Sequence, residues 1–127
     1  MKQIAIFALV LGTAIPCVSA AEFVVPVNTA RKITYRMSLN EDCSSIGDVV
    51  ARITANPSHG TVVVKKGVDN PFFTRDNPRY SCNTRKVASV QVWYTPQRDY
   101  LGSDSVGIDY LTPSGNSIPV TVSIIVR

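Results

Sequence analysis

His59 is the only histidine in the 127-residue chain, so any imidazole chemistry would depend on it. Ser58 and Ser81 are the candidate nucleophiles, and Asp99 or Asp104 could orient the ring. Nothing in their spacing brings a base within hydrogen-bond reach of a nucleophile, and the chain has no nucleophile-elbow motif. His59 lies in a Pro-Ser-His-Gly stretch. We therefore interpret it as a surface residue of a turn.

Paired carboxylates are the other common catalytic set, because glycoside hydrolysis needs two of them facing one groove. Asp99, Asp104 and Asp109 lie close enough in the sequence to cluster. However, capping of a chain corner explains Asp104, and a solvent-facing position on a strand explains Asp109. We therefore predict that the protein is not an enzyme.

The cysteines point to an oxidising compartment. Cys17 falls within the leader described below, which leaves Cys43 and Cys82 as an even pair. In an exported chain such a pair predicts a disulfide, which closes a loop of about 40 residues and contributes ~3–4 kcal/mol. The alternative is two buried, unpaired thiols. Two cysteines and one distant histidine do not make a zinc site, so we expect no metal and no cofactor.

The first twenty residues have the pattern of a secretory signal peptide. Lys2 supplies the positive start, 4–15 is an apolar run, and Val18-Ser19-Ala20 suits a signal peptidase that cleaves after Ala20. The run is short for a membrane span, and the residues before Cys17 lack a lipobox. We expect a mature domain over residues 21–127, soluble, periplasmic or extracellular, with no transmembrane segment and a net charge of +3.

The mature chain alternates apolar and polar residues nearly throughout, which is typical of strands that bury one face. Turn signals separate about seven such segments, and seven short strands in roughly 100 residues predict an all-β, two-sheet antiparallel sandwich. No segment shows a convincing helical stripe. The clearest alternating segments are 23–27, 33–39, 49–55, 61–64, 90–95, 106–110 and 118–126.

Two stretches carry a resemblance to a known group. Residues 56–66 read NPSHGTVVVKK, and residues 92–110 read VWYTPQRDYLGSDSVGIDY. Together they resemble the motifs of bacterial cadherin-like and immunoglobulin-like (Ig-like) repeats over about residues 49–127. The resemblance implies an extracellular Ig-like β-sandwich used for adhesion, surface display or spacing. The turn 112–116 lacks the carboxylate that calcium-binding repeats often carry, and the chain holds a single copy.

The largest departure from those repeats is an insertion at residues 67–87, where the repeats have a short hairpin. Long connections inside a compact domain are often functional. Between Lys65 and Lys86 six basic and two acidic residues give +4, which exceeds the net charge of the whole mature chain. Exposed arginines with aromatic residues are typical of binding hot spots. The predicted contact residues are Phe72, Phe73, Arg75, Arg79, Tyr80, Arg85 and Lys86.

From these residues we expect an exported, non-enzymatic binding module of the cell envelope. Its partner would be an envelope protein or an anionic surface polymer such as a polysaccharide, whereas nucleic acid is a poor candidate because exported proteins seldom meet it. In the alternative interpretation the aromatic residues pack under the loop and the cations only solvate it. Two rival functions are a structural subunit that assembles through strand edges and a calcium-dependent adhesion module.

Overall fold

The computed structural model describes residues 22–127 and shows an all-β sandwich, as the alternation predicted. The predicted signal peptide lies outside the described residues. No helix among those residues is long and apolar enough to cross a bilayer. The strands are β1 (Glu22–Val25), β2 (Arg31–Arg36), β3 (Val50–Ala55), β4 (Gly60–Asp69), β5 (Val87–Pro96), β6 (Gly102–Leu111) and β7 (Ser117–Val126), with one 3-10 helix, η1 (Tyr80–Thr84).

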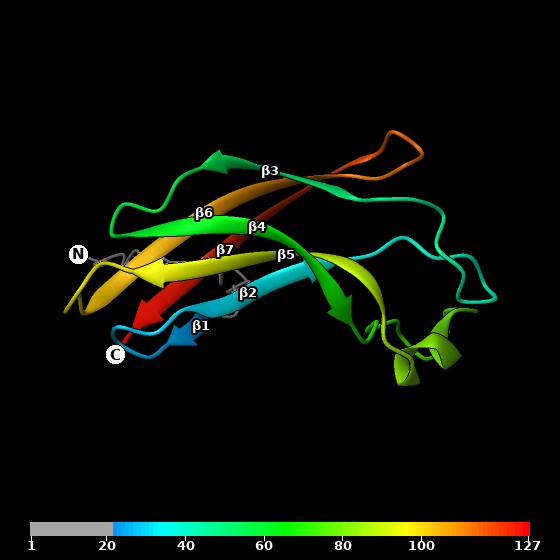
Figure 1. Cartoon of the computed structure of the whole chain (residues 1–127), viewed down its shortest axis with the longest axis horizontal. Coiled ribbons are helices and arrows are strands. Elements are labelled where there is room, and N and C mark those ends of the chain that lie inside the picture. The colour runs from blue at the N-terminus through cyan, green and yellow to red at the C-terminus, as the bar shows by residue number, and fades with distance from the viewer. Residues whose placement is uncertain (1–21) are drawn as a thin grey trace, which may run out of the picture.

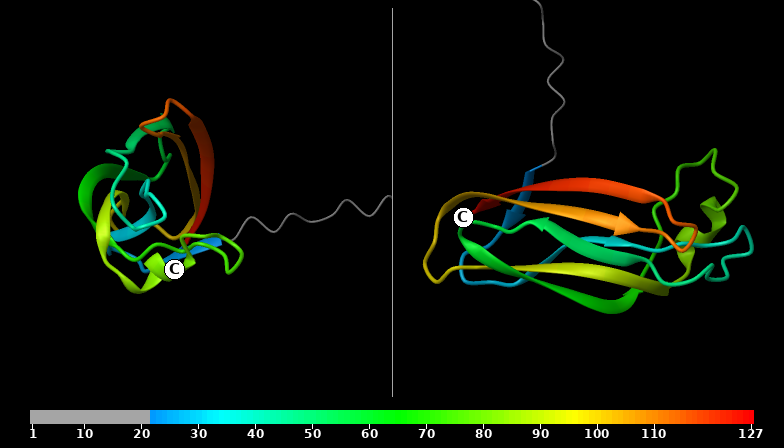
Figure 2. Two further views of the ribbon diagram at one scale, coloured as in Figure 1. Left: turned by 90° about the vertical axis from the view of Figure 1, so that its right-hand side faces the viewer. Right: turned by 90° about the horizontal axis from the view of Figure 1, so that it is seen from above.

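Two sheets face each other with their apolar sides inward. One has the strand order β1-β7-β6-β3 and the other the order β2-β5-β4. Neighbouring strands within each sheet run antiparallel, except β1 and β7, which run parallel. This is the strand order of an immunoglobulin-like sandwich whose first strand has joined the sheet of the last. Figure 2 shows the two layers edge-on.

The core lies between the layers and contains the alternating residues of the central strands. Val92 and Tyr94 of β5 are fully buried, as are Val106 and Tyr110 of β6. Burying side chains of this size stabilises the fold by about 1.5–3 kcal/mol each. The core therefore joins the two sheets mainly through their middle strands, and Val25 of β1 and Ile33 of β2 extend it to two edge strands.

Prolines lie where the ladders do not need an N–H group. Pro26 directly follows β1, an edge strand. Pro119 lies in β7, but β1 covers β7 only from Ser123 to Val126, so one side of β7 at Pro119 has no neighbouring strand. Neither proline therefore leaves a strand ladder without a donor that it needs.

Strand β2 differs from its predicted pattern. The alternation placed Ile33, Tyr35 and Met37 on one face, but the pairing with β5 is irregular between Lys32 and Thr34. Ile33 and Thr34 therefore both face the core, and the Tyr110 hydroxyl lies 3.1 Å from Thr34 Oγ1. After this irregularity each residue of β2 faces the side of the sheet opposite to the one that simple alternation predicts, because one extra residue shifts the two-residue period. Tyr35 faces outward and Arg36 faces inward.

The predicted insertion boundaries also need correction. Gly67, Val68 and Asp69 continue β4, and β5 already begins at Val87, so the connection between the strands is residues 70–86. It contains η1 and lies at the end of the sandwich away from the C-terminus (Figures 1 and 2). We call residues 70–86 the insertion from here on.

Candidate interaction site

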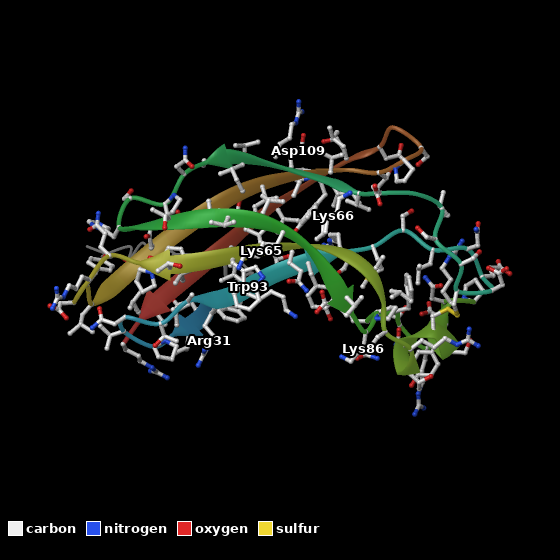
Figure 3. All side chains as sticks on the ribbon, in the orientation of Figure 1. Arg31, Lys65, Lys66, Lys86, Trp93 and Asp109 are labelled. Atoms are coloured by element: carbon white, nitrogen blue, oxygen red, sulfur yellow. A yellow bond between two sulfur atoms is a disulfide. The ribbon has the colours of Figure 1, made fainter. Side chains whose placement is uncertain are left out.

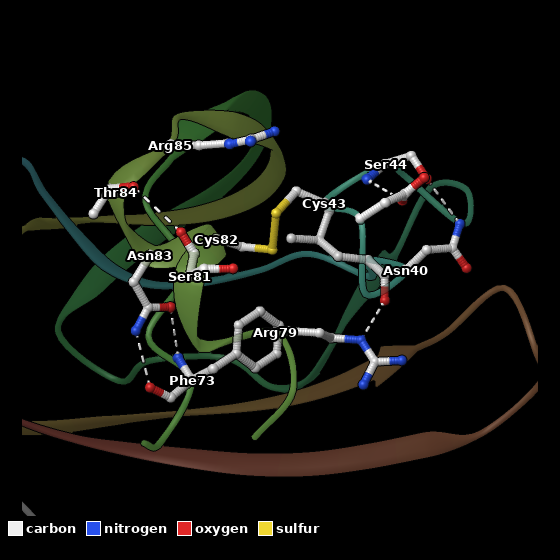
Figure 4. The surroundings of a disulfide bond; sticks show 12 residues. Asn40, Cys43, Ser44, Phe73, Arg79, Ser81, Cys82, Asn83, Thr84 and Arg85 are labelled. Atoms are coloured by element: carbon white, nitrogen blue, oxygen red, sulfur yellow. Dashed lines mark hydrogen bonds between the residues drawn. A yellow bond between two sulfur atoms is a disulfide. The ribbon is translucent and has the colours of Figure 1, made fainter. Parts of the chain in front are cut away.

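A disulfide between Cys43 and Cys82 ties the insertion to the β2–β3 connection. The sulfur atoms are 2.03 Å apart and the Cα atoms 5.6 Å apart, so the predicted pairing is confirmed. Cys82 lies in η1 and is fully buried. Figure 4 shows the bond joining the two segments. The disulfide therefore fixes the 3-10 helix against a second loop.

Two asparagines hold the rest of the insertion in place. Asn83 accepts a hydrogen bond from the Phe73 N–H group and donates one to the Phe73 carbonyl, each at 2.9 Å (Figure 4). Asn70 Nδ2 donates to the carbonyl oxygens of Asn83 and Arg85 at 3.1 and 3.0 Å. A side-chain amide can satisfy a backbone donor and acceptor at once, which makes it an effective clamp. Sequence reasoning missed both asparagines, because nothing local marks their distant partners.

The predicted aromatic residues divide into exposed and packed ones. Phe72 is 56% exposed and Tyr80 is 44% exposed. Phe72 contacts the Tyr35 ring edge-on, with centroids 5.3 Å apart, and its own ring lies 5.5 Å from the Arg36 guanidinium. Phe73 is only partly exposed. Two aromatic residues of the insertion therefore reach the surface while a third supports it.

The predicted cations also divide. Arg79 is partly buried, and its Nε donates to the Leu39 carbonyl at 2.7 Å, which makes it a brace between the insertion and the β2–β3 connection (Figure 4). Lys86 is exposed and lies 3.3 Å from Asn70 Oδ1. Arg75 and Arg85 are exposed, and across residues 22–127 no side-chain hydrogen bond or ion pair engages either of them. Three of the four predicted cations are therefore available at the surface.

A buried carboxylate on the outer face of the β2-β5-β4 sheet was not predicted. Asp69 is only 5% exposed, pairs with Lys32, and accepts hydrogen bonds from Ser89 Oγ at 2.6 Å and Gln91 Nε2 at 2.9 Å. Burial opposes ionisation, but these donors outweigh it and hold the pKa of Asp69 below its usual value. Gln91 in turn accepts a hydrogen bond from the Trp93 indole at 2.9 Å.

This network orients the only tryptophan outward. Trp93 carries the Lys65 ammonium 5.0 Å from its ring, and both residues lie on the outer face of the sheet (Figure 3). Alternation alone does not decide which face of the sheet carries Trp93. The structure places it on the outer face, partly exposed, where its hydrogen bond to Gln91 fixes the ring.

Three of the residues considered for catalysis, Ser58, His59 and Asp104, do lie together, but backbone N–H groups make the contacts and the His59 imidazole is not bonded to the carboxylate. Asp104 accepts hydrogen bonds from the N–H groups of Ser58 and His59, and the His59 ring stacks on Tyr100 with centroids 4.2 Å apart. Asp99 is engaged with Asn28, and Asp109 with Arg52 and Ser117. Each carboxylate therefore has its own structural partners. In the part of the chain that the structure describes, no three His, Cys, Asp or Glu side chains are placed to hold a metal ion.

The chain was compared with protein-family models, with curated proteins and with solved structures, and none of them matches it.

Proposed function

We propose that the protein is an exported, non-enzymatic binding module of the cell envelope, and that the insertion contacts an anionic surface polymer. One observation carries the proposal. The exposed cations Arg75, Arg85 and Lys86 and the exposed rings of Phe72 and Tyr80 all project from one braced segment.

The bracing supports binding because it reduces the entropy lost when a partner is captured. The disulfide, the Asn83 clamp and the Arg79 brace fix the backbone from which these side chains extend. Long basic side chains on a fixed frame can still adapt to a repeating anionic partner. The disulfide also supports export, since such bonds persist in oxidising compartments.

The charge balance favours a polyanion over a protein as the partner. Asp69, which precedes the insertion, is paired with Lys32. Within the insertion Asp76 keeps its charge while it accepts a hydrogen bond from Thr74, and four basic residues against this one carboxylate give residues 70–86 a net charge of +3. The remaining exposed groups are mainly cationic, and a cluster of this sign attracts anions over several ångströms and weakens with salt. An envelope protein with an acidic patch would use the same side chains and is the alternative partner.

Retention on an immobilised acidic polysaccharide, such as alginate, tests the proposal. We expect the protein to be retained at low salt and the triple variant Arg75→Ser, Arg85→Ser, Lys86→Ser to flow through with an unchanged melting temperature. Arg79 is left intact because it braces the fold.

The matched control removes three exposed cations elsewhere, as Arg31→Ser, Arg52→Ser and Arg98→Ser. Both triple variants lose the same charge. If the binding site is on the insertion, only the variant at residues 75, 85 and 86 should lose retention. Equal loss from both would show that net charge alone acts. Full retention of the first variant would overturn the proposal.

A second candidate function rests on the edge of the β2-β5-β4 sheet. Strand β4 has ten residues and pairs with β5 on one side only, and Val63 and Val68 on it are more than half exposed. A long exposed edge of this kind can accept a strand from another chain, as in a structural subunit of an assembly. Concentration-dependent oligomers in size-exclusion chromatography would favour this function, and a monomer at all concentrations would remove it.

A further inference from the structure

A cavity of about 390 Å³ lies between β3 and β4, the two edge strands on one side of the sandwich. Its apolar walls include Ala51 of β3, Val64 of β4 and Val90 of β5. The volume falls within the range of small-molecule sites in proteins. The open side of the sandwich therefore has a cavity large enough for a small molecule.

Arg36 provides a cation at this cavity. The irregularity in β2 turns its side chain inward, and the guanidinium lies 5.7 Å from the Tyr110 ring and 5.5 Å from the Phe72 ring. Its Nε atom is buried without a hydrogen-bond partner, and across residues 22–127 no carboxylate pairs with it. The guanidinium is thus a partly buried cation without a carboxylate partner, and its charge favours an anion beside it.

Lys66 provides a second cation in the same row of the sheet. Arg36 and Lys66 both lie opposite Val90, one on each neighbouring strand. Both Lys65 and Lys66 border the cavity. Successive residues of a strand face opposite sides, so the Lys66 side chain points toward the cavity, whereas the Lys65 ammonium lies over Trp93 on the outer face (Figure 3). Asp48 also lines the cavity, with its carboxylate 3.4 Å from the Lys66 ammonium. Both side chains are highly exposed, and such pairs contribute little, so the two cations still outnumber this one carboxylate.

We infer that this cavity binds a small amphiphilic anion, of the class of medium-chain aliphatic carboxylates. The carboxylate lies over Val90 between Arg36 and Lys66, where it can accept hydrogen bonds from both. The aliphatic chain runs over Val64 toward Ala51 and replaces water along the apolar walls. The two cations select a ligand with a negative head group, and the apolar walls select one with an aliphatic tail.

Octanoate is a suitable probe, with 1-octanol and octylamine as probes of equal chain length but different head groups. Titration calorimetry and melting temperature measure the binding, because a ligand held only by the folded state raises stability. We expect octanoate to bind and to raise the melting temperature, and the alcohol and amine to do neither at the same concentration. Equal binding of the three probes, or no binding of octanoate, would overturn the inference.

Two matched pairs of variants locate the site on β4. Val64→Phe fills the cavity and should abolish octanoate binding, whereas Val63→Phe, on the opposite face, should leave it intact. Lys66→Ser should weaken binding roughly tenfold, the effect of losing one charged hydrogen bond, whereas Lys65→Ser should not. Because Lys65 and Lys66 are both exposed, this second pair stays informative even if Val64→Phe fails to fold.

An unchanged octanoate affinity in Lys66→Ser would overturn the placement of the head group. The other occupant to test for is a strand of a second copy. If the protein forms dimers that Val64→Phe dissociates, and octanoate does not bind, the cavity is an interface between copies and the inference is wrong.

Discussion

The Tyr94 hydroxyl donates a 2.7 Å hydrogen bond to Asp104 and so links the two sheets of the sandwich. Tyr94 lies on β5 and Asp104 on β6, and both sit close to the turn that joins β3 to β4. The same carboxylate accepts the N–H groups of Ser58 and His59 in that turn at 2.9 and 3.0 Å. One side chain therefore joins both layers and the connection between them.

Replacing this carboxylate should destabilise the fold. Asp104→Asn keeps the shape of the side chain but removes its charge and turns one acceptor into a donor. We expect a loss of about 2 kcal/mol in the free energy of unfolding, because the charged acceptor of the Tyr94, Ser58 and His59 hydrogen bonds is lost. Urea denaturation measures the change. Asp48→Asn, at an exposed carboxylate, is the control and should change stability little. A loss in Asp104→Asn no larger than in the control would contradict the role of Asp104.

Acid should remove the contribution of Asp69. Its pKa in the folded protein lies below the ordinary value of 3.8 because, although burial opposes ionisation, the donors Lys32, Ser89 and Gln91 favour the carboxylate. A lowered folded pKa gives stability that is present above the unfolded pKa and lost as the pH falls through the folded one. The difference in free energy of unfolding between the wild type and Asp69→Asn should thus be constant from pH 5 to 7, and it should become smaller below about pH 4.

Urea denaturation at a series of pH values between 2 and 7 tests this expectation. Asp48→Asn serves again as the control, and its difference from the wild type should stay small throughout. A difference for Asp69→Asn that persists unchanged down to pH 2 would show that the charge of Asp69 does not stabilise the fold.

The disulfide should contribute more to stability than any single side chain of the insertion. Its cysteines are 39 residues apart, and closing such a loop restricts the unfolded chain by about 4 kcal/mol. The double variant Cys43→Ser, Cys82→Ser should unfold at lower urea and expose the insertion to limited proteolysis. Equal stability of the double variant and the wild type would mean that the pair is not bonded in solution.

Two arginines of the insertion should behave differently. Arg79→Ala removes a 2.7 Å hydrogen bond to the Leu39 carbonyl and should cost about 1–3 kcal/mol of stability. Arg75→Ala removes an exposed side chain with no bonded partner in the described chain and should change the melting temperature little. Thermal melts of the two variants side by side test this. Equal effects would contradict the division into a brace and a contact residue.

Local patterns predicted most of the fold. Alternation over residues 90–95, 106–110 and 118–126 predicted strands that bury one face, and one face of each is buried, with Val92, Val106 and Ile124 in the core. An even number of cysteines after removal of the leader was enough to predict the pair Cys43–Cys82. These signals work because they depend on neighbours in the sequence or on simple counting.

The parts that could not be predicted depend on distant partners. The irregularity at Ile33 turns Arg36 inward, yet nothing in the local sequence marks it. Asp69 looks like an ordinary loop residue until β4 extends to it and Lys32 arrives from β2. Arg79 and Arg75 have the same side chain and similar neighbours, and only the position of the Leu39 carbonyl separates their roles.

Binding on the insertion can be mapped residue by residue. Backbone amide chemical shifts recorded while a short acidic oligosaccharide is added show which residues the partner contacts. We expect shifts concentrated on residues 72–86, with amides of the β2-β5-β4 outer face around Trp93 and Lys65 unchanged. Shifts centred on that outer face, or no shifts at low salt, would contradict it.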